Sequence, residues 1–219
     1  MSEVSEFFSS KSHFLDELNA REVLAELFTD AHTAYTFTDE PVTDEQLRAA
    51  YDLAKWAPTG VNGQPLRVAV VRGGQAKQQL LNALPCGNRE QAEGAPLVLV
   101  CGAKMDFQHD LPLLHPRGER YERLLTANNK MRTLMAHTSA TIQIAYLILA
   151  LRALGLETGP MNPDDSQLLH DHFFQVRISS QFWLLTWAMQ VLMLTRNAGR
   201  GWGTMRCFAN RRLTPDPIR

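Results

Sequence analysis

One 25-residue segment, 130–154, restricts the fold of this chain more than any other part of it. Leu147, Leu151 and Leu154 repeat at helical spacing, and Gly155 follows directly, as is common after the last turn of a helix. Apolar residues are dense all around this helix rather than confined to one stripe. We therefore expect a long central helix that other elements bury.

The remaining patterns mix helices and strands. Residues 66–72 are rich in β-branched side chains and predict a strand, whereas 95–102 are apolar throughout and predict a central strand covered on both faces. Thr43 and Gln46 form a capping-box pattern at the start of a helix that Pro58 ends. The chain is therefore expected to form a single α+β or α/β domain.

Weaker patterns fill the gaps between these elements. Residues 1–28 have helical spacing, 80–84 predict a short helix, and 106–126 are expected to be irregular because they carry two prolines. Asn162 and Pro163 predict another helix start, with Asn as the N-cap and Pro in the first position.

Composition excludes several classes of protein. The 219 residues carry a net charge of −1, which gives no overall attraction for nucleic acid or anionic lipid. The three cysteines are odd in number and lack metal-type spacing, so a reducing, cytoplasmic location is expected. We see no secretory signal in the first residues, and the longest apolar stretch, near 182–195, is too short to span a bilayer.

A discontinuity in charge appears near residue 175. The last 45 residues contain seven Arg, one Asp and no Lys or Glu, which leaves 15 basic and 22 acidic residues in 1–174. Three of the four tryptophans also fall in this basic tail. One interpretation is a nucleic-acid-binding tail, although its arginines show no regular face. The other is a segment that was not selected to fold with the rest.

Two segments could bind a small ligand. The loop 58–65 contains small residues together with Asn62 and Gln64, whose amides suit the edge of a flat heteroaromatic ring. The alternative is a tight turn whose amides satisfy its own backbone. Pro160 and Met161 lie in a turn before the expected helix, where free N–H groups favour an anion or an electron-rich ring atom, unless the turn is an ordinary connection.

Other kinds of chemistry lack support in the sequence. His170 and His172 are two residues apart and would point to different faces of a helix, so we expect no metal site. The chain has no G-x-S-x-G, P-loop or G-x-G-x-x-G motif, which removes the main support for a serine hydrolase or nucleoside triphosphatase. No side-chain nucleophile or dyad appears, and we expect no catalytic side chain.

Several segments, in order and at the right spacing, resemble the nitroreductase-like FMN flavoproteins. The similarity extends from Leu27 to Phe174, and the malonic semialdehyde reductase branch, linked to pyrimidine breakdown, is the most similar. The segments that carry it are 27–31, 52–59, 87–88, 95–96 and 145–161.

The resemblance implies a homodimeric α+β fold, a three-layer α-β-α sandwich whose central mixed sheet packs on the long helix, with residues 1–174 as the flavin-binding domain. It also implies that FMN binds at the subunit interface and that NAD(P)H gives a hydride to flavin N5 in a ping-pong reaction. The reduced flavin would then reduce a small aldehyde, such as malonic semialdehyde, or a nitro or quinone acceptor. The cofactor would carry the chemistry, and no nucleic acid or membrane would be involved.

The resemblance also assigns site residues. The segment His32 to Ala34 matches the family position at the FMN phosphate and ribityl chain, and Asn62 matches the Asn that hydrogen-bonds the flavin. Asn162 and Pro163 match the pair whose backbone faces N5 and O4. With the local chemistry described above, the expected cofactor-binding residues are His32, Thr33, Ala34, Asn62, Gln64, Pro160, Met161, Asn162 and Pro163.

The chain departs from the family pattern at three places, of which His32 and Pro163, together with the altered tail, support a rival hypothesis: a degenerate, non-catalytic domain that only binds a partner or ligand. His32 stands where the family favours Arg, which removes a permanent bidentate cation. Pro163 stands at a donor position and has no N–H. The run 138–141 replaces the branch's Arg-Asn-Ser-Ser.

The resemblance stops after Phe174, where the family's last strand and basic ending are expected. Codons compatible with residues 186–190 and 202–206, read one nucleotide back, allow motifs of that ending. We therefore hypothesise that residues from about 175 onward are an out-of-frame translation. Loss of the family's strand would leave an unpaired edge in the sheet.

Overall fold

A computed structural model describes residues 20–174 and 190–196 of the chain. The elements in chain order are α3 (Ala20–Leu24), η1 (Ala25–Thr29), α4 (Asp44–Ala54), η2 (Gly60–Asn62), β1 (Leu66–Val71), α5 (Gly74–Asn82), α6 (Cys86–Gly94), β2 (Leu97–Ala103), η3 (Phe107–Asp110), α7 (Leu111–Leu114), α8 (Gly118–Ala127), α9 (Asn129–Ala153), β3 (Leu156–Met161), α10 (Ser166–Phe173) and β4 (Gln190–Arg196).

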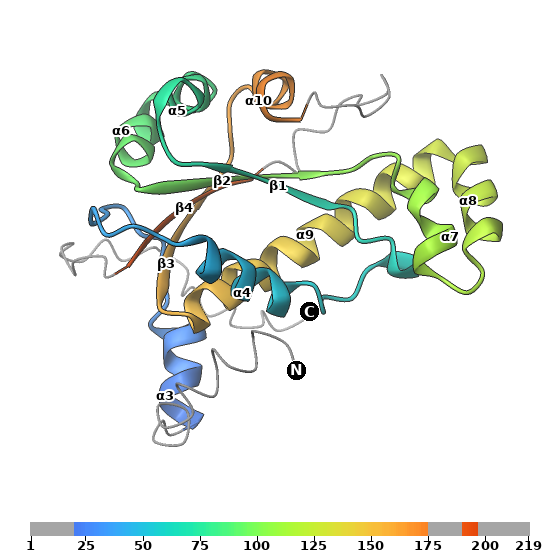
Figure 1. The fold of residues 1–219 in the computed structure, drawn as a ribbon, viewed down its shortest axis with the longest axis horizontal. Coiled ribbons are helices and arrows are strands. Elements are labelled where there is room, and N and C mark those ends of the chain that lie inside the picture. Colours follow the sequence, from blue (N-terminus) through green and yellow to red (C-terminus); the bar gives the residue numbers. More distant parts are fainter. Residues whose placement is uncertain (1–19, 175–189, 197–219) are drawn as a thin grey trace, which may run out of the picture.

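The described elements form three layers. The sheet has the strand order β1-β2-β4-β3, with α5, α6 and α10 on one face and α4 and α9 on the other (Figure 1). This confirms the α+β class, the sandwich and the long helix. Every strand pair in the described part of the sheet is antiparallel, so the expectation of a mixed sheet is wrong there. The apolar patterns of the strands indicated burial but not strand direction.

The central strand β2 is buried along its whole length, as predicted. Leu97 and Leu99 pack on the face covered by α4 and α9, whereas Val98 and Val100 pack on the opposite face with α5 and α10. The alternation of a strand therefore places successive apolar side chains in two separate cores.

Helix α9 runs beside the sheet and α4, with buried residues along most of its length, and Gly155 ends it with a φ of +73°. By length and composition α9 is the one described helix that could cross a membrane, with 44% of its apolar window buried inside the structure. Residues of α9 pack in two of the apolar clusters, as expected for the core helix that the sequence predicts.

Helix α4 begins as its sequence predicts. The Thr43 backbone N–H donates to Gln46 Oε1 at 2.9 Å, and the Gln46 N–H donates to Thr43 Oγ1 at 3.3 Å. Both halves of the capping box are present, and they orient the helix that forms one wall of the candidate site.

The expectation that residues 106–126 are irregular is wrong, because this region forms η3, α7 and α8. Pro112 lies at the N-terminal end of α7, where its missing N–H costs nothing. Phe107, Leu111 and Leu125 pack with α9 residues in a third apolar cluster. This tertiary packing stabilises helices too short to be recognised by periodicity.

The helix predicted to start at Asn162 instead starts at Ser166. Asp165 is the N-cap, and its carboxylate accepts from the Leu168 N–H at 2.8 Å. The N–H groups of Asp164 and Asp165 both donate to the Ala83 carbonyl, at 2.9 and 3.2 Å. The Asp165 cap and these long-range hydrogen bonds place the helix start after the Asn162-Pro163 pair. Pro163 therefore lies in the segment before the helix rather than in its first turn.

The segment expected to be a turn with free N–H groups is strand β3. It lies at an edge of the described sheet and pairs with β4, with Pro160 opposite Leu192. Proline is tolerated on an edge strand because its N–H is not needed by a second neighbour.

The basic tail contributes to the described sheet through β4, which lies between β2 and β3. Val98 pairs with Met193, and Thr158 pairs with Leu194. The expected unpaired edge is therefore not found at this place in the sheet. Residues 1–19 of the predicted N-terminal helix and the rest of the tail lie outside the described residues.

Candidate functional site

The loop after α4 holds three non-glycine residues in the left-handed region. Val61, Asn62 and Gln64 have φ values of 51°, 55° and 44°. Such conformations cost energy and cluster at functional sites, where surrounding contacts hold them in place. The strained backbone therefore makes this loop a candidate ligand-binding element.

Contacts with neighbouring elements hold this loop. The Gly60 N–H donates to Ser139 Oγ on α9 at 3.0 Å. A Cβ on Gly63 would lie 2.5 Å from ring atoms of Phe107, so only glycine fits there without a shift. Packing and hydrogen bonds together keep the strained backbone in one conformation.

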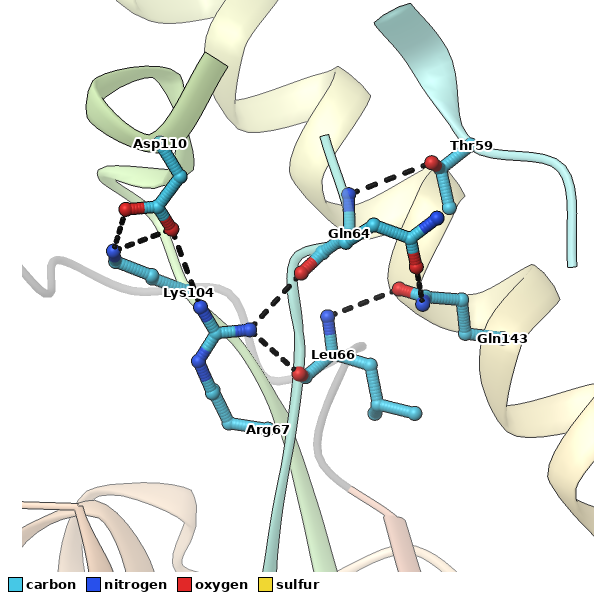
Figure 2. Close-up of polar contacts among 7 residues, drawn as sticks. All are labelled: Thr59, Gln64, Leu66, Arg67, Lys104, Asp110 and Gln143. Atoms are coloured by element: carbon cyan, nitrogen blue, oxygen red, sulfur yellow. Dashed lines mark hydrogen bonds and ion pairs between the residues drawn. The ribbon is translucent and has the colours of Figure 1, made fainter. Parts of the chain in front are cut away.

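Three side-chain amides form a chain of hydrogen bonds beneath the loop. Gln143 on α9 accepts from the Leu66 N–H at 3.0 Å and donates to Gln64 Oε1 at 2.6 Å (Figure 2). Gln64 donates to Asn62 Oδ1 at 2.9 Å, and Asn62 donates to the Leu114 carbonyl at 2.9 Å. We call this chain the amide relay.

An ionic cluster fixes the other side of the same segment. Arg67 donates to the carbonyls of Gln64 and Leu66, at 2.9 and 2.8 Å, and contacts Asp110 at 3.3 Å. Lys104 pairs with the same carboxylate at 2.7 Å (Figure 2). Asp110 thus ties β1 and β2 to the start of α7.

The loop opens on a cavity of about 1170 Å³, which we call the α4–β1 groove. Asn62 and Gln64 line it, as do Trp56 and Leu113, whose side chains are 79% and 91% exposed. The other lining residues are Leu47, Arg48, Tyr51, Asp52, Lys55, Leu66, Arg67, Val68, Val70, Leu99, Asp110, Leu114 and Leu147. An apolar groove with a few convergent amides suits a flat, partly polar ligand.

The expected phosphate segment lies elsewhere, against β3. The Ala34 N–H donates to the Thr158 carbonyl at 3.0 Å, Ala34 is buried, and Thr33 is half-buried. His32 is exposed, with Nδ1 3.2 Å from the Asp30 carbonyl. Thr158 is fully buried, and its hydroxyl has no hydrogen-bond partner among the residues that the structure describes.

The structure therefore brings the predicted site residues together in two groups. None of residues 32–34 or 160–163 lines the α4–β1 groove. Pro160 is half-buried in β3, Met161 packs toward α10, Asn162 is exposed and Pro163 is buried. The N–H groups that follow Pro163 bond to Ala83, so they are not free for a ligand as the helix-start prediction required.

Metal chemistry gains no support from the geometry. Within residues 20–174 and 190–196 no group of three or more His, Cys, Asp or Glu side chains is placed to hold an ion.

Comparison with known proteins identifies the family. The sequence profile of the Nitroreductase family matches residues 28–191. This chain belongs to that family. The match includes the loop, the amide relay, β3 and residues 175–191 of the basic tail, so the expectation that the resemblance stops after Phe174 is wrong.

Relatives and solved structures of this family are similar to the chain along much of its length. A Streptomyces griseus protein named "Putative NADH dehydrogenase/NAD(P)H nitroreductase" is 42% identical over 147 residues, which is 67% of this chain and 75% of that protein. A nitroreductase family protein from Streptococcus pneumoniae has a TM-score of 0.67 at 17% identity, covering 84% of this chain and 94% of the other. A "putative nitroreductase in complex with FMN" from Exiguobacterium sibiricum has a TM-score of 0.65 at 17% identity, covering 86% and 93%.

The sequence patterns missed the residues that support the loop. Gln143, Arg67 and Asp110 were not predicted, although each contacts the loop or its flanking strand. One signal was available for Gln143, since a glutamine among the apolar residues of a buried helix needs a hydrogen-bond partner. Nothing local identifies that partner.

Proposed function

We propose that this nitroreductase family protein is an NAD(P)H-dependent FMN oxidoreductase that reduces a small acceptor. The observation that carries the proposal is the strained loop that holds Asn62 and Gln64 at the groove. Bound FMN would supply the transfer of a hydride from NAD(P)H to the acceptor. The absence of a side-chain nucleophile agrees with chemistry that belongs to a cofactor.

The residues present fit FMN in two parts. Asn62 and Gln64 would hydrogen-bond the polar edge of the isoalloxazine, and Trp56 would cover apolar ring surface. His32, Thr33 and Ala34 would lie at the phosphate and ribityl chain, in a segment that the Ala34 N–H ties to the Thr158 carbonyl of β3. Pro160, Met161, Asn162 and Pro163 would approach the ring through the backbone, with Pro163 contributing no donor.

A homodimer would unite these two parts. In one chain the groove and the β3 segment are separate, and the groove exposes Tyr51, Trp56, Val70 and Leu113 to solvent. Such an apolar patch is typical of an interface. We propose that a second copy covers the groove and brings its own β3 segment to the loop.

The proposed acceptor is a small aldehyde that carries a carboxylate, such as malonic semialdehyde, or a nitro or quinone compound. Arg48, Lys55 and Arg67 line the groove together with Asp52 and Asp110, and this excess of basic side chains favours an anionic substrate. Each of the three is also paired with a carboxylate, Arg48 with Glu45 and the other two with these aspartates. Cys86 and Cys101 are free thiols, which agrees with the cytoplasmic location we propose.

A second candidate is a binding domain of the same fold without turnover. It is favoured by His32, which offers no permanent charge for a phosphate, and by Pro163, which offers no N–H. This candidate predicts that flavin binds without supporting oxidation of NADPH.

A visible absorption spectrum of the purified chain, followed by NADPH oxidation with added FMN and a nitroaromatic acceptor, tests the proposal. We expect a yellow protein that oxidises NADPH only when the acceptor is present. Flavin binding without oxidation would favour the binding domain, and failure to bind added FMN would overturn the proposed FMN oxidoreductase.

A further inference from the structure

We propose that Gln143 is a positioning residue that fixes which amide atoms Gln64 and Asn62 present to the α4–β1 groove. The inference rests on the proposed flavin-binding function of the groove, but its structural half stands on the amide relay alone. Gln143 is 3% exposed and does not line the groove, so it would act only through Gln64.

The direction of the relay is set by backbone groups at its two ends. The Leu66 N–H can only donate, so the Gln143 atom 3.0 Å away must be its oxygen. The Leu114 carbonyl can only accept, so the Asn62 atom 2.9 Å away must be its nitrogen. Between these ends each amide donates to the next, and no single amide can rotate by 180° without opposing two like atoms.

A defined set of hydrogen-bonding groups follows from this direction. Each NH₂ group carries two N–H donors, of which the relay uses one on Gln64 and one on Asn62. The second donor of each remains for a ligand in the groove. The matching ligand is a ring edge with carbonyl or ring-nitrogen acceptors, and the pyrimidine edge of a flavin has this chemistry.

Fixing the amides in advance lowers the cost of binding. A glutamine amide that is free to rotate must be ordered when it binds a ligand, whereas one held at both ends is already oriented. Arg67 contacts the backbone carbonyls of Gln64 and Leu66 and is paired with Asp110, so it stabilises the loop without competing for the amides.

The substitution Gln143→Glu tests the inference through pH. When protonated, the introduced carboxyl donates to Gln64 Oε1 as the amide does, and burial raises its pKa. When ionised, it faces Gln64 with two acceptors and forces the relay to reverse or break. Between about pH 5 and pH 9 we expect the Kd for FMN to rise about tenfold relative to the wild-type protein, measured by flavin fluorescence.

Gln46→Glu is the matched control. Gln46 is also a buried glutamine, but its oxygen accepts from the Thr43 N–H, a role that a carboxylate fills. Its pH profile for FMN should follow that of the wild-type protein. If wild-type protein binds FMN and Gln143→Glu shows the same profile, the inference is overturned while the proposed function stands.

A ligand-free measurement tests the relay even if FMN does not bind or the variant does not fold. In the wild-type protein, NMR hydrogen exchange of the side-chain amide of the buried Gln143 should be at least about tenfold slower than that of the exposed Gln78. Equal exchange rates would overturn the relay, whatever the flavin result.

Discussion

At the scale of single residues, the loop combines strain with tight packing. Val61 is β-branched and held at a φ of 51°, a conformation that glycine would adopt more readily. Gly63, by contrast, has an ordinary φ of −73°, and the ring of Phe107 requires its lack of a side chain. Glycine is needed here for space rather than for conformational freedom.

Gly63→Ala should therefore lower the free energy of unfolding by about 1–3 kcal/mol, because the added methyl group forces Phe107 or the loop to move. Urea denaturation measures this. In Gly87→Ala the new methyl meets no atom within 4 Å, and the substitution lies in a helix. That control should be neutral or stabilising by up to about 1 kcal/mol. Equal effects at both positions would contradict the packing argument.

His137 on α9 is a second residue whose environment is expected to lower the stability of the folded protein. Both of its ring nitrogens are buried and have no hydrogen-bond partner within residues 20–174 and 190–196, and desolvation lowers its pKa below 6.5. The unfolded state therefore takes up a proton first as the pH falls below about 6.5, and stability is lost in that range. Above it, both states are neutral and His137 makes no pH-dependent contribution.

His137→Leu should stabilise the protein and flatten the fall in stability between about pH 6.5 and pH 5. Thermal unfolding across this range measures both effects. The control is His109→Leu, since His109 is exposed and bonded to Glu122 at 2.8 Å. An unchanged pH slope in His137→Leu would show that other groups cause the loss.

At the scale of elements, one carboxylate joins three pieces of structure. Asp110 precedes α7 and pairs with Lys104, which follows β2 and is only 16% exposed, and with Arg67 on β1. The relay also ends at Leu114 of α7. The position of α7 therefore matters for the loop.

Asp110→Ala should cost about 1–3 kcal/mol, because Lys104 would keep its charge in a mostly buried place without a partner. Glu119→Ala removes an ion pair with Arg123 at 4.0 Å in which both side chains are more than 70% exposed, and it should cost about 0.5 kcal/mol or less. Denaturant unfolding of the two variants compares them directly. Similar losses in the free energy of unfolding would mean that burial does not determine how much these ion pairs contribute to stability.

At the scale of the whole molecule, the exposed apolar side chains of the α4–β1 groove have no covering element in a single described chain. If the proposed homodimer forms through this groove, Trp56→Glu places a charge in its interface and should yield a monomer with weaker FMN binding. Light scattering after size exclusion measures the mass. Leu124→Glu changes an exposed leucine of α8 outside the groove and should leave the dimer intact.

The origin of the tail is also a question about the whole chain. That residues from about 175 onward are translated out of frame stays a prediction, although the family match extends to residue 191 and β4 pairs with both of its neighbours. The nucleotide sequence tests this prediction. If the family ending is absent from both alternative reading frames, the out-of-frame hypothesis is refuted.

The sequence by itself determined the elements whose signals are local. The capping box at Thr43, the apolar strand β2 and the helix ended by Gly155 each depend on residues within a few positions of one another. The spacing of apolar side chains and the capping of helix ends depend on residues that are close in sequence, so these elements could be predicted.

Tertiary structure alone decided how the site is built. The turn predicted at Pro160 became a strand because β4 pairs with it, and the helix start moved to Ser166 because Ala83 takes the preceding N–H groups. Gln143 and Gln64 are 79 positions apart, yet one hydrogen bond between them orients the predicted ligand-binding amides. A local pattern shows that a buried polar group needs a partner, but only the folded chain determines which residue is within 3 Å of it.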